Sequence, residues 1–173
     1  TGQTVAISFY KLLNRLNNSP ENVKHSIQQA SRVLICLPAD VQDRDAALQI
    51  FSVWKSCFPH AEIFGLLSVI GTDEPGTLNK SINIVHKNDI SILGLPGKRI
   101  KSLLTENPVN IAIDLNRKYD TLSTLLILMS NAKIRAGYYH EYRTRLYNFL
   151  VRVSPETSPQ HAIQALLTYF KLK

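Results

Sequence analysis

The stretch Val33-Leu34-Ile35-Cys36-Leu37, which Pro38 follows, decides the fold of this sequence. A short apolar run rich in branched residues is typical of a strand that is buried on both faces of a parallel sheet. A second apolar run covers residues 61–69. The segment between the two runs predicts a helix that ends before Pro59, because its apolar residues share one face: Ala47, Ile50, Phe51 and Trp54. A strand, a helix and a strand of this length predict a right-handed βαβ unit.

The same alternation continues to the end of the chain. Further strands are expected at four short apolar runs, at 82–85, 90–93, 109–113 and 134–138. Helices are expected at three segments with one apolar face, at 98–104, 119–129 and 163–170. Alternating strands and helices predict an α/β fold, with a Rossmann-like, doubly wound and mainly parallel sheet, over residues 32–173.

Residues 1–31 predict a separate N-terminal helical extension. The first helix is indicated by the helical spacing of Phe9, Leu12, Leu13 and Leu16. Ser19-Pro20 supplies a capping hydroxyl and a proline at the first helical position, so a second helix is expected to start there. This extension either packs on the α/β core or serves as a docking arm.

The composition is that of one globular domain. A chain of 173 residues with 45% hydrophobic and 19% charged residues is large enough to bury a core and does not have the composition of a disordered protein. Its apolar runs fall far short of the roughly 20 residues that a membrane span needs. Cys36 and Cys57 stand in apolar surroundings without metal-ligand spacing, so we expect two buried thiols and no metal. Free thiols are typical of a reducing, cytoplasmic setting, and no cofactor is expected.

The net charge of +7 suggests an anionic partner. The basic residues gather in the second half of the sequence: Lys98, Arg99, Lys101, Arg117, Lys118, Lys133, Arg135, Arg143, Arg145 and Arg152. A basic surface attracts nucleic acid, anionic lipid headgroups or phosphorylated sugars, and it is also compatible with a solvated face that has no partner. The aromatic cluster of Tyr138, Tyr139, Tyr142 and Tyr147 would stack on bases or on sugar rings equally well. So few interleaved aromatic residues make nucleic acid the least favoured partner.

No Gly-x-Gly-x-x-Gly motif follows the first strand, so a dinucleotide cofactor is not expected. The segment Gly94-Leu95-Pro96-Gly97-Lys98 is similar to a phosphate loop, but it lacks the spacing and the Ser or Thr after the lysine. It is interpreted either as a plain turn or as a helix start whose amides bind an anion.

The loop after the first strand holds the best candidates for chemistry, Asp40 and Asp43. In open α/β sheets, ligands bind outside the carboxyl ends of the strands. A carboxylate there could accept the proton of an acceptor hydroxyl during glycosyl transfer. The alternative is that Asp43 or Asp45 only caps the following helix.

Four segments, in order, resemble the N-terminal, acceptor-side domain of the lipopolysaccharide heptosyltransferase family of GT-B glycosyltransferases. Together they cover about residues 32–170. The first segment is 32–63, which ends in Phe58-Pro59-His60-Ala61-Glu62-Ile63, and the second joins Ala112-Ile113-Asp114-Leu115 to Ser130-Asn131-Ala132-Lys133-Ile134-Arg135-Ala136-Gly137-Tyr138. The third is Leu146-Tyr147-Asn148, and the fourth is His161-Ala162-Ile163-Gln164-Ala165-Leu166-Leu167. The sequence departs from the family pattern in two places. Gln42 stands where the family usually has a glycine directly before the aspartate, and the N-terminal helices have no counterpart in the typical enzyme.

The resemblance implies a two-domain enzyme in which this half binds a phosphorylated sugar or sugar-lipid acceptor. It implies Asp43 as catalytic base, with Asp40 as the alternative, and acceptor phosphates held by Lys98, Arg99, Arg143 and Arg145. It also implies a donor-binding domain or partner chain, and a cytoplasmic location at the periphery of the inner membrane. Three hypotheses follow, namely an acceptor-binding domain that is inactive alone, a non-catalytic binding or interaction protein, and a nucleic-acid-binding domain that uses the basic face.

Overall fold

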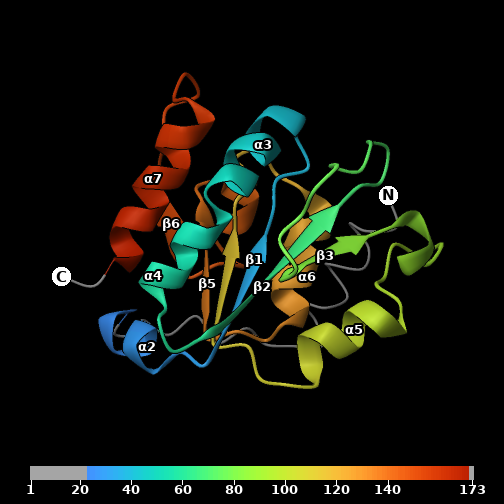
Figure 1. Cartoon of the computed structure of the whole chain (residues 1–173), viewed down its shortest axis with the longest axis horizontal. Coiled ribbons are helices and arrows are strands. Elements are labelled where there is room, and N and C mark those ends of the chain that lie inside the picture. Colours follow the sequence, from blue (N-terminus) through green and yellow to red (C-terminus); the bar gives the residue numbers. More distant parts are fainter. Residues whose placement is uncertain (1–22, 172–173) are drawn as a thin grey trace.

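The structure, a computed structural model, describes residues 23–171 and contains one six-stranded sheet (Figure 1). The strands are β1 (Arg32–Cys36), β2 (Glu62–Ser68), β3 (Ile82–Val85), β4 (Ile111–Asp114), β5 (Ile134–Tyr138) and β6 (Phe149–Val151). They lie in the order β3-β2-β1-β4-β5-β6, and every neighbouring pair is parallel. The predicted α/β, Rossmann-like fold is therefore confirmed.

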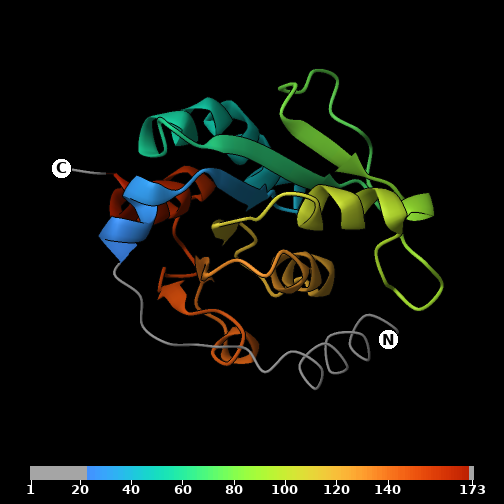
Figure 2. The ribbon, with the colours of Figure 1, turned by 90° about the horizontal axis from the view of Figure 1, so that it is seen from below.

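Helices cover both faces of the sheet, as the turned view in Figure 2 shows. One face carries α2 (Val23–Gln29), α3 (Val41–Gln49), α4 (Trp54–Cys57) and α7 (Pro159–Phe170). The other face carries α5 (Lys98–Thr105) and α6 (Thr121–Met129). Three short 3₁₀ helices, η1 (Phe51–Val53), η2 (Lys87–Asp89) and η3 (Glu141–Arg143), complete the connections. The two hydrophobic clusters lie on opposite faces of β1 because its side chains alternate between them.

The central strand β1 behaves as its sequence predicts. Its five residues are all buried, and Val33 and Ile35 join one cluster while Leu34 and Cys36 join the other. Cys36 and Cys57 are both buried free thiols, in keeping with their apolar surroundings.

One expected strand is absent, and one strand of the sheet was not expected. Residues 90–93 do not form a strand, because only Ile90 pairs, through an isolated antiparallel bridge with Pro96. The strand β6 was not predicted, since only three residues, Phe149-Leu150-Val151, extend the sheet at its edge. Such a short run carries too little periodicity to be recognised in a sequence.

The described part of the N-terminal extension packs on the core. Ile27 and Ala30 are buried in the cluster that also contains Trp54 and Phe170. The first predicted helix lies outside the described residues.

Two arginines that were counted as surface charge, Arg135 and Arg143, lie in the core. Arg135, within β5, is 4% exposed, and it donates hydrogen bonds to the carbonyl oxygens of Leu146 at 2.7 Å and Ala132 at 2.8 Å. Arg143 has no exposed surface. Burial lowers the pKa of Arg135, and its carbonyl partners are what make a buried guanidinium tolerable. The basic surface is therefore smaller than the sequence suggests.

Candidate functional site

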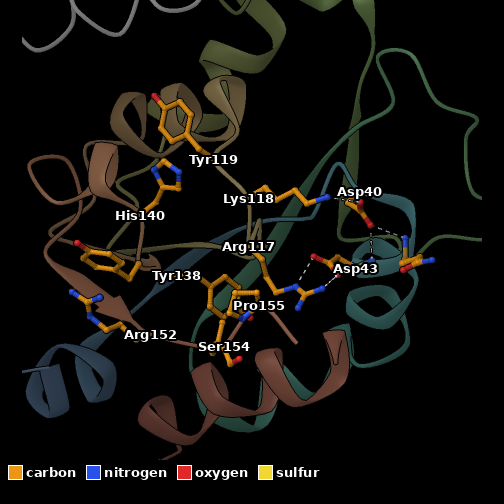
Figure 3. A pocket seen from close by; sticks show the side chains of 13 residues that line it. Asp40, Asp43, Arg117, Lys118, Tyr119, Tyr138, His140, Arg152, Ser154 and Pro155 are labelled. Atoms are coloured by element: carbon orange, nitrogen blue, oxygen red, sulfur yellow. Dashed lines mark hydrogen bonds and ion pairs between the residues drawn. The ribbon is translucent and has the colours of Figure 1, made fainter. Parts of the chain in front are cut away.

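A cleft of about 690 Å³ lies at the carboxyl edge of the sheet (Figure 3). It sits beside the point where the strand order reverses, between β1 and β4, which is where open α/β sheets bind ligands. Its lining follows the ends of four strands and comprises Asp40, Gln42, Asp43, Arg117, Lys118, Tyr119, Tyr138, Tyr139, His140, Arg152, Val153, Ser154 and Pro155. The parallel sheet thus brings together residues that are far apart in the sequence.

Asp40 caps the helix α3. Its carboxylate accepts hydrogen bonds from the backbone amides of Gln42 at 3.1 Å and Asp43 at 3.3 Å. Its other oxygen lies 3.7 Å from the ammonium of Lys118. The helix cap, which the sequence placed at Asp43 or Asp45, is therefore Asp40.

Asp43 lies on the cleft wall in a two-point ion pair with Arg117, drawn as dashed lines in Figure 3. Its Oδ2 accepts from Nε of Arg117 at 2.9 Å, and its Oδ1 accepts from Nη2 at 2.7 Å. The hydrogen bonds to Asp43 raise the pKa of Arg117, so this guanidinium stays charged. Both oxygens of Asp43 therefore accept charge-assisted hydrogen bonds from the same guanidinium, which fixes the orientation of the carboxylate on the cleft wall.

A buried polar network supports the floor of the cleft. Asp114, at the end of β4, accepts hydrogen bonds from Tyr147 at 2.6 Å and from Ser123 at 3.0 Å, and it lies 3.1 Å from Nη2 of Arg143. Arg143 donates to the carbonyl oxygens of Asn116 at 2.8 Å and Lys118 at 3.0 Å, as well as to that of Tyr138 at 3.1 Å. One guanidinium therefore ties together the loops that follow β4 and β5. Burial raises the pKa of Tyr147, which keeps the phenol neutral as a donor.

The rim of the cleft combines cations with aromatic rings. Lys118 is exposed, and the guanidinium of Arg152 lies 3.5 Å above the ring centre of Tyr139. The rings of Tyr119 and His140 have centres 5.3 Å apart, and Figure 3 shows them side by side. Such a rim suits a ligand that carries both an anionic group and a ring.

The hydroxyl of Tyr138 is buried at the cleft without a hydrogen-bond partner among residues 23–171. Burial raises the pKa of Tyr138 far above its ordinary value of 10.0, and the nearby Asp43 adds to the rise. The phenol is therefore a neutral group.

The phosphate-binding residues expected from the resemblance do not gather at this cleft. Arg143 is buried in the network below it, while Lys98, Arg99 and Arg145 are exposed outside its lining. Arg99 pairs with Asp89 at 2.6 Å and donates to the carbonyl oxygen of Ile84 at 2.6 Å. The Gly94–Lys98 segment is a turn in which the amide of Gly97 donates to the carbonyl oxygen of Asp89 at 2.6 Å.

A protein family described as "Family of unknown function (DUF6913)" matches residues 6–172. The chain belongs to the DUF6913 family. No curated protein matches the sequence.

The fold of this DUF6913 chain is similar to a solved structure described as the glycosyl transferase family 9 from Veillonella parvula DSM 2008, with a TM-score of 0.55 and 14% sequence identity. The match covers 87% of the DUF6913 chain and 43% of that protein. The chain thus spans less than half the length of the glycosyltransferase. The likeness shows the fold alone, which is a Rossmann-like α/β fold.

Three basic residues of the cleft were expected only as part of a general basic surface and not as site residues: Arg117, Lys118 and Arg152. Arg117 and Lys118 follow the buried strand β4, so their position at a strand end was a usable signal. Arg152 follows β6, a strand that was not predicted. The sequence therefore contained no indication that Arg152 lies at the cleft. Among the described residues, no group of three or more His, Cys, Asp or Glu side chains is placed to hold a metal ion.

Replacing Asp120 with asparagine tests the electrostatics beside the cleft. Asp120 caps α6 through a 2.6 Å hydrogen bond from the amide of Ser123, and burial raises its pKa above the ordinary 3.8. A raised pKa means that the folded state binds more protons than the unfolded state. The carboxyl of Asp120 therefore lowers the free energy of unfolding as the pH rises from the ordinary pKa through the raised pKa of the folded state. Asparagine caps equally well and does not titrate.

We expect Asp120→Asn to match the wild type within roughly 0.5 kcal/mol in acid, where the carboxyl is protonated. The variant should gain relative stability as the pH rises to neutral, measured by urea unfolding across that range. A stability difference that is flat with pH, or that falls, would contradict the assigned burial of the charge.

Proposed function

We propose that this chain is a glycosyltransferase-like domain that binds a phosphorylated sugar in the cleft and does not transfer glycosyl groups by itself. The observation that carries the proposal is the pairing of both Asp43 oxygens with Arg117, beside a cleft whose rim holds Lys118 and Arg152. A cleft with rim cations and an already paired carboxylate favours binding over base catalysis.

The charges of the cleft favour an anionic ligand. Arg117 neutralises Asp43, and Asp40 already caps a helix and lies near Lys118. With Lys118 set against Asp40, Arg152 leaves the lining with an excess of one positive charge. Lysine and arginine both bind phosphate, arginine in two-point geometry and lysine as a point charge.

The remaining lining favours a sugar as the rest of the ligand. Tyr119, Tyr139 and His140 present rings at the rim, and the side-chain amide of Gln42 can both donate and accept hydrogen bonds. The hydroxyl of Ser154 donates to Glu156 and can accept a hydrogen bond from a ligand. A sugar ring offers apolar faces and hydroxyls, which match both kinds of surface. A heptose or sugar-lipid acceptor, and a donor-binding domain or partner chain, are the finer parts of this proposal, suggested by the resemblance to the heptosyltransferases.

The test is calorimetric titration of the chain with a hexose phosphate, the same hexose without phosphate, and inorganic phosphate. We expect the hexose phosphate to bind more tightly than either part. The double variant Lys118→Gln/Arg152→Gln should weaken that binding about tenfold or more, because two charge-assisted contacts are lost.

Lys133→Gln is the matched control. Lys133 is exposed and precedes β5, so it lies at the amino edge of the sheet, opposite the cleft. This variant should bind the hexose phosphate like the wild type. If both variants lost the same affinity for the hexose phosphate, the loss would come from the lower net charge of the chain and not from the cleft. If the wild type did not bind the hexose phosphate, the proposal would be refuted. Stronger, salt-dependent binding of an RNA or DNA oligonucleotide would favour the nucleic-acid hypothesis instead.

A further inference from the structure

The segment between η2 and α5 forms a tight turn that projects from one side of the domain (Figure 2). The bridge between Ile90 and Pro96 closes the turn. The amide of Ser91 donates to the carbonyl oxygen of Leu95 at 2.8 Å, and the amide of Gly94 donates to that of Ser91 at 2.8 Å. Gly94 has a φ of 77°, a left-handed conformation that glycine adopts without strain. The turn therefore has a defined shape.

This turn divides its four aliphatic side chains between core and solvent. Ile90 and Leu95 pack against the hydrophobic cluster on the α5–α6 face. Ile92 is 103% exposed and Leu93 is 68% exposed, relative to a fully accessible residue. Among the described residues they are the only two consecutive large aliphatic residues that are both exposed. Polar residues at these two positions would leave the inward packing of the turn intact, so its architecture does not require an aliphatic pair.

Exposed lysines flank the pair in the sequence, at the two ends of the turn. Lys87 precedes it, Lys98 and Lys101 follow it in the first turns of α5, and all three are exposed. The one acidic residue between positions 86 and 101 is Asp89, which is engaged by Arg99 at 2.6 Å. The tip of the turn is thus apolar, and its base carries a positive excess.

We propose that this turn is a membrane-docking element that inserts Ile92 and Leu93 into the boundary between headgroups and acyl chains of an anionic lipid surface. Lys87, Lys98 and Lys101 then lie at the level of the lipid phosphates. The apolar side chains at the tip would meet the acyl chains, and the lysines behind them would meet the anionic headgroups. Among the described residues, no helix is long and apolar enough to cross a membrane.

The small size of the apolar tip favours a lipid surface over a protein partner. A stable protein interface buries about 800 Å² on each side, which two adjacent side chains on a turn do not supply. Insertion into a bilayer needs only a short apolar protrusion, because the lipid rearranges around it and nearby cations add electrostatic attraction. This inference does not depend on what the cleft binds.

The test is co-sedimentation of the whole chain with vesicles of phosphatidylcholine alone and of phosphatidylcholine mixed with phosphatidylglycerol. We expect binding to the anionic vesicles that weakens with salt. Ile92→Ser/Leu93→Ser should lower the apparent affinity about tenfold or more, since the apolar area that enters the lipid is lost. Lys98→Gln/Lys101→Gln should lower binding to the anionic vesicles by about tenfold as well.

Two matched controls separate these effects from general surface changes. Val53→Ser removes an exposed aliphatic side chain on the opposite face of the sheet, and Lys133→Gln removes a lysine at the amino edge. Both should sediment like the wild type. A direct measurement is the emission of Leu93→Trp, which should shift to shorter wavelength with anionic vesicles while the buried Trp54 contributes a constant background.

Three results would overturn the proposal. They are an absence of vesicle binding by the wild type, undiminished binding by the double serine variant, and an unchanged emission of Leu93→Trp. Because the substituted side chains are exposed, the variants should keep the melting temperature of the wild type, and a circular dichroism melt checks that each is folded.

Discussion

Replacing Arg143 with methionine is expected to lower the free energy of unfolding by about 3–5 kcal/mol. Arg143 and Asp114 both have fully buried side chains, with Nη2 and Oδ2 3.1 Å apart. Without the guanidinium, Asp114 keeps hydrogen bonds from Ser123 and Tyr147 but loses its counter-charge. The carbonyl oxygens of Asn116 and Lys118 also lose their donor. Urea unfolding followed by circular dichroism measures the loss.

Two comparisons make this expectation specific. Arg145→Met removes an exposed arginine from the same segment and should change the free energy of unfolding by less than about 1 kcal/mol. Asp114→Asn/Arg143→Met should recover part of the loss, because no uncompensated charge remains in the core. If Arg143→Met were as stable as Arg145→Met, the buried ion pair would not exist in solution. Should Arg143→Met fail to fold alone, the double variant still provides the comparison.

Replacing Trp54 with alanine is expected to cost about 3–5 kcal/mol of unfolding free energy. The indole is fully buried and stacks on Phe58 with ring centres 6.5 Å apart. It also meets Phe170 edge-on at 6.1 Å, which joins α4 to α7 on one face of the sheet. Removing the ring leaves a large cavity between the two helices, and the lost contacts add to the lost burial.

The neighbouring residue supplies the control for this substitution. Val53 is 37% exposed, so Val53→Ser should change the free energy of unfolding by roughly 0.5 kcal/mol or less. Trp54→Phe should lie between the two, because it keeps an aromatic ring and removes an indole nitrogen that has no partner among residues 23–171. Equal stability of Trp54→Ala and Val53→Ser would contradict the aromatic contact between α4 and α7.

The buried strands were predictable because burial on both faces leaves a continuous apolar run. The runs around Ile35 and Ile113 show this pattern, and both lie in central strands. Residues 90–93 show the limit of the same reasoning, since Ile90 packs inward while Ile92 points to solvent. An apolar run records composition, and only tertiary contacts decide which of its side chains are covered.

The sequence predicted where the candidate site lies better than it predicted which residues form it. The rule that ligands bind at the carboxyl ends of strands placed Asp40 and Asp43 at the edge where the cleft lies. Sequence alone could not show that Arg117, 74 residues after Asp43, would pair with it. Nor could it separate the buried Arg143 from the exposed Arg145, because both stand in a basic and aromatic stretch. Residue type predicts charge, whereas burial depends on the packed structure.

The contact of Arg99 with β3 covers part of one edge of the sheet. An open six-stranded sheet ends in exposed strands, and unpaired carbonyl groups on an edge strand invite another chain to add to it and begin aggregation. The carbonyl oxygen of Ile84 in β3 already accepts a hydrogen bond from Nη2 of Arg99, whose charge stands over the edge. A second strand would have to displace this bond and desolvate the guanidinium. Arg99 thus occupies a carbonyl group that an added strand would use at the β3 edge of the sheet.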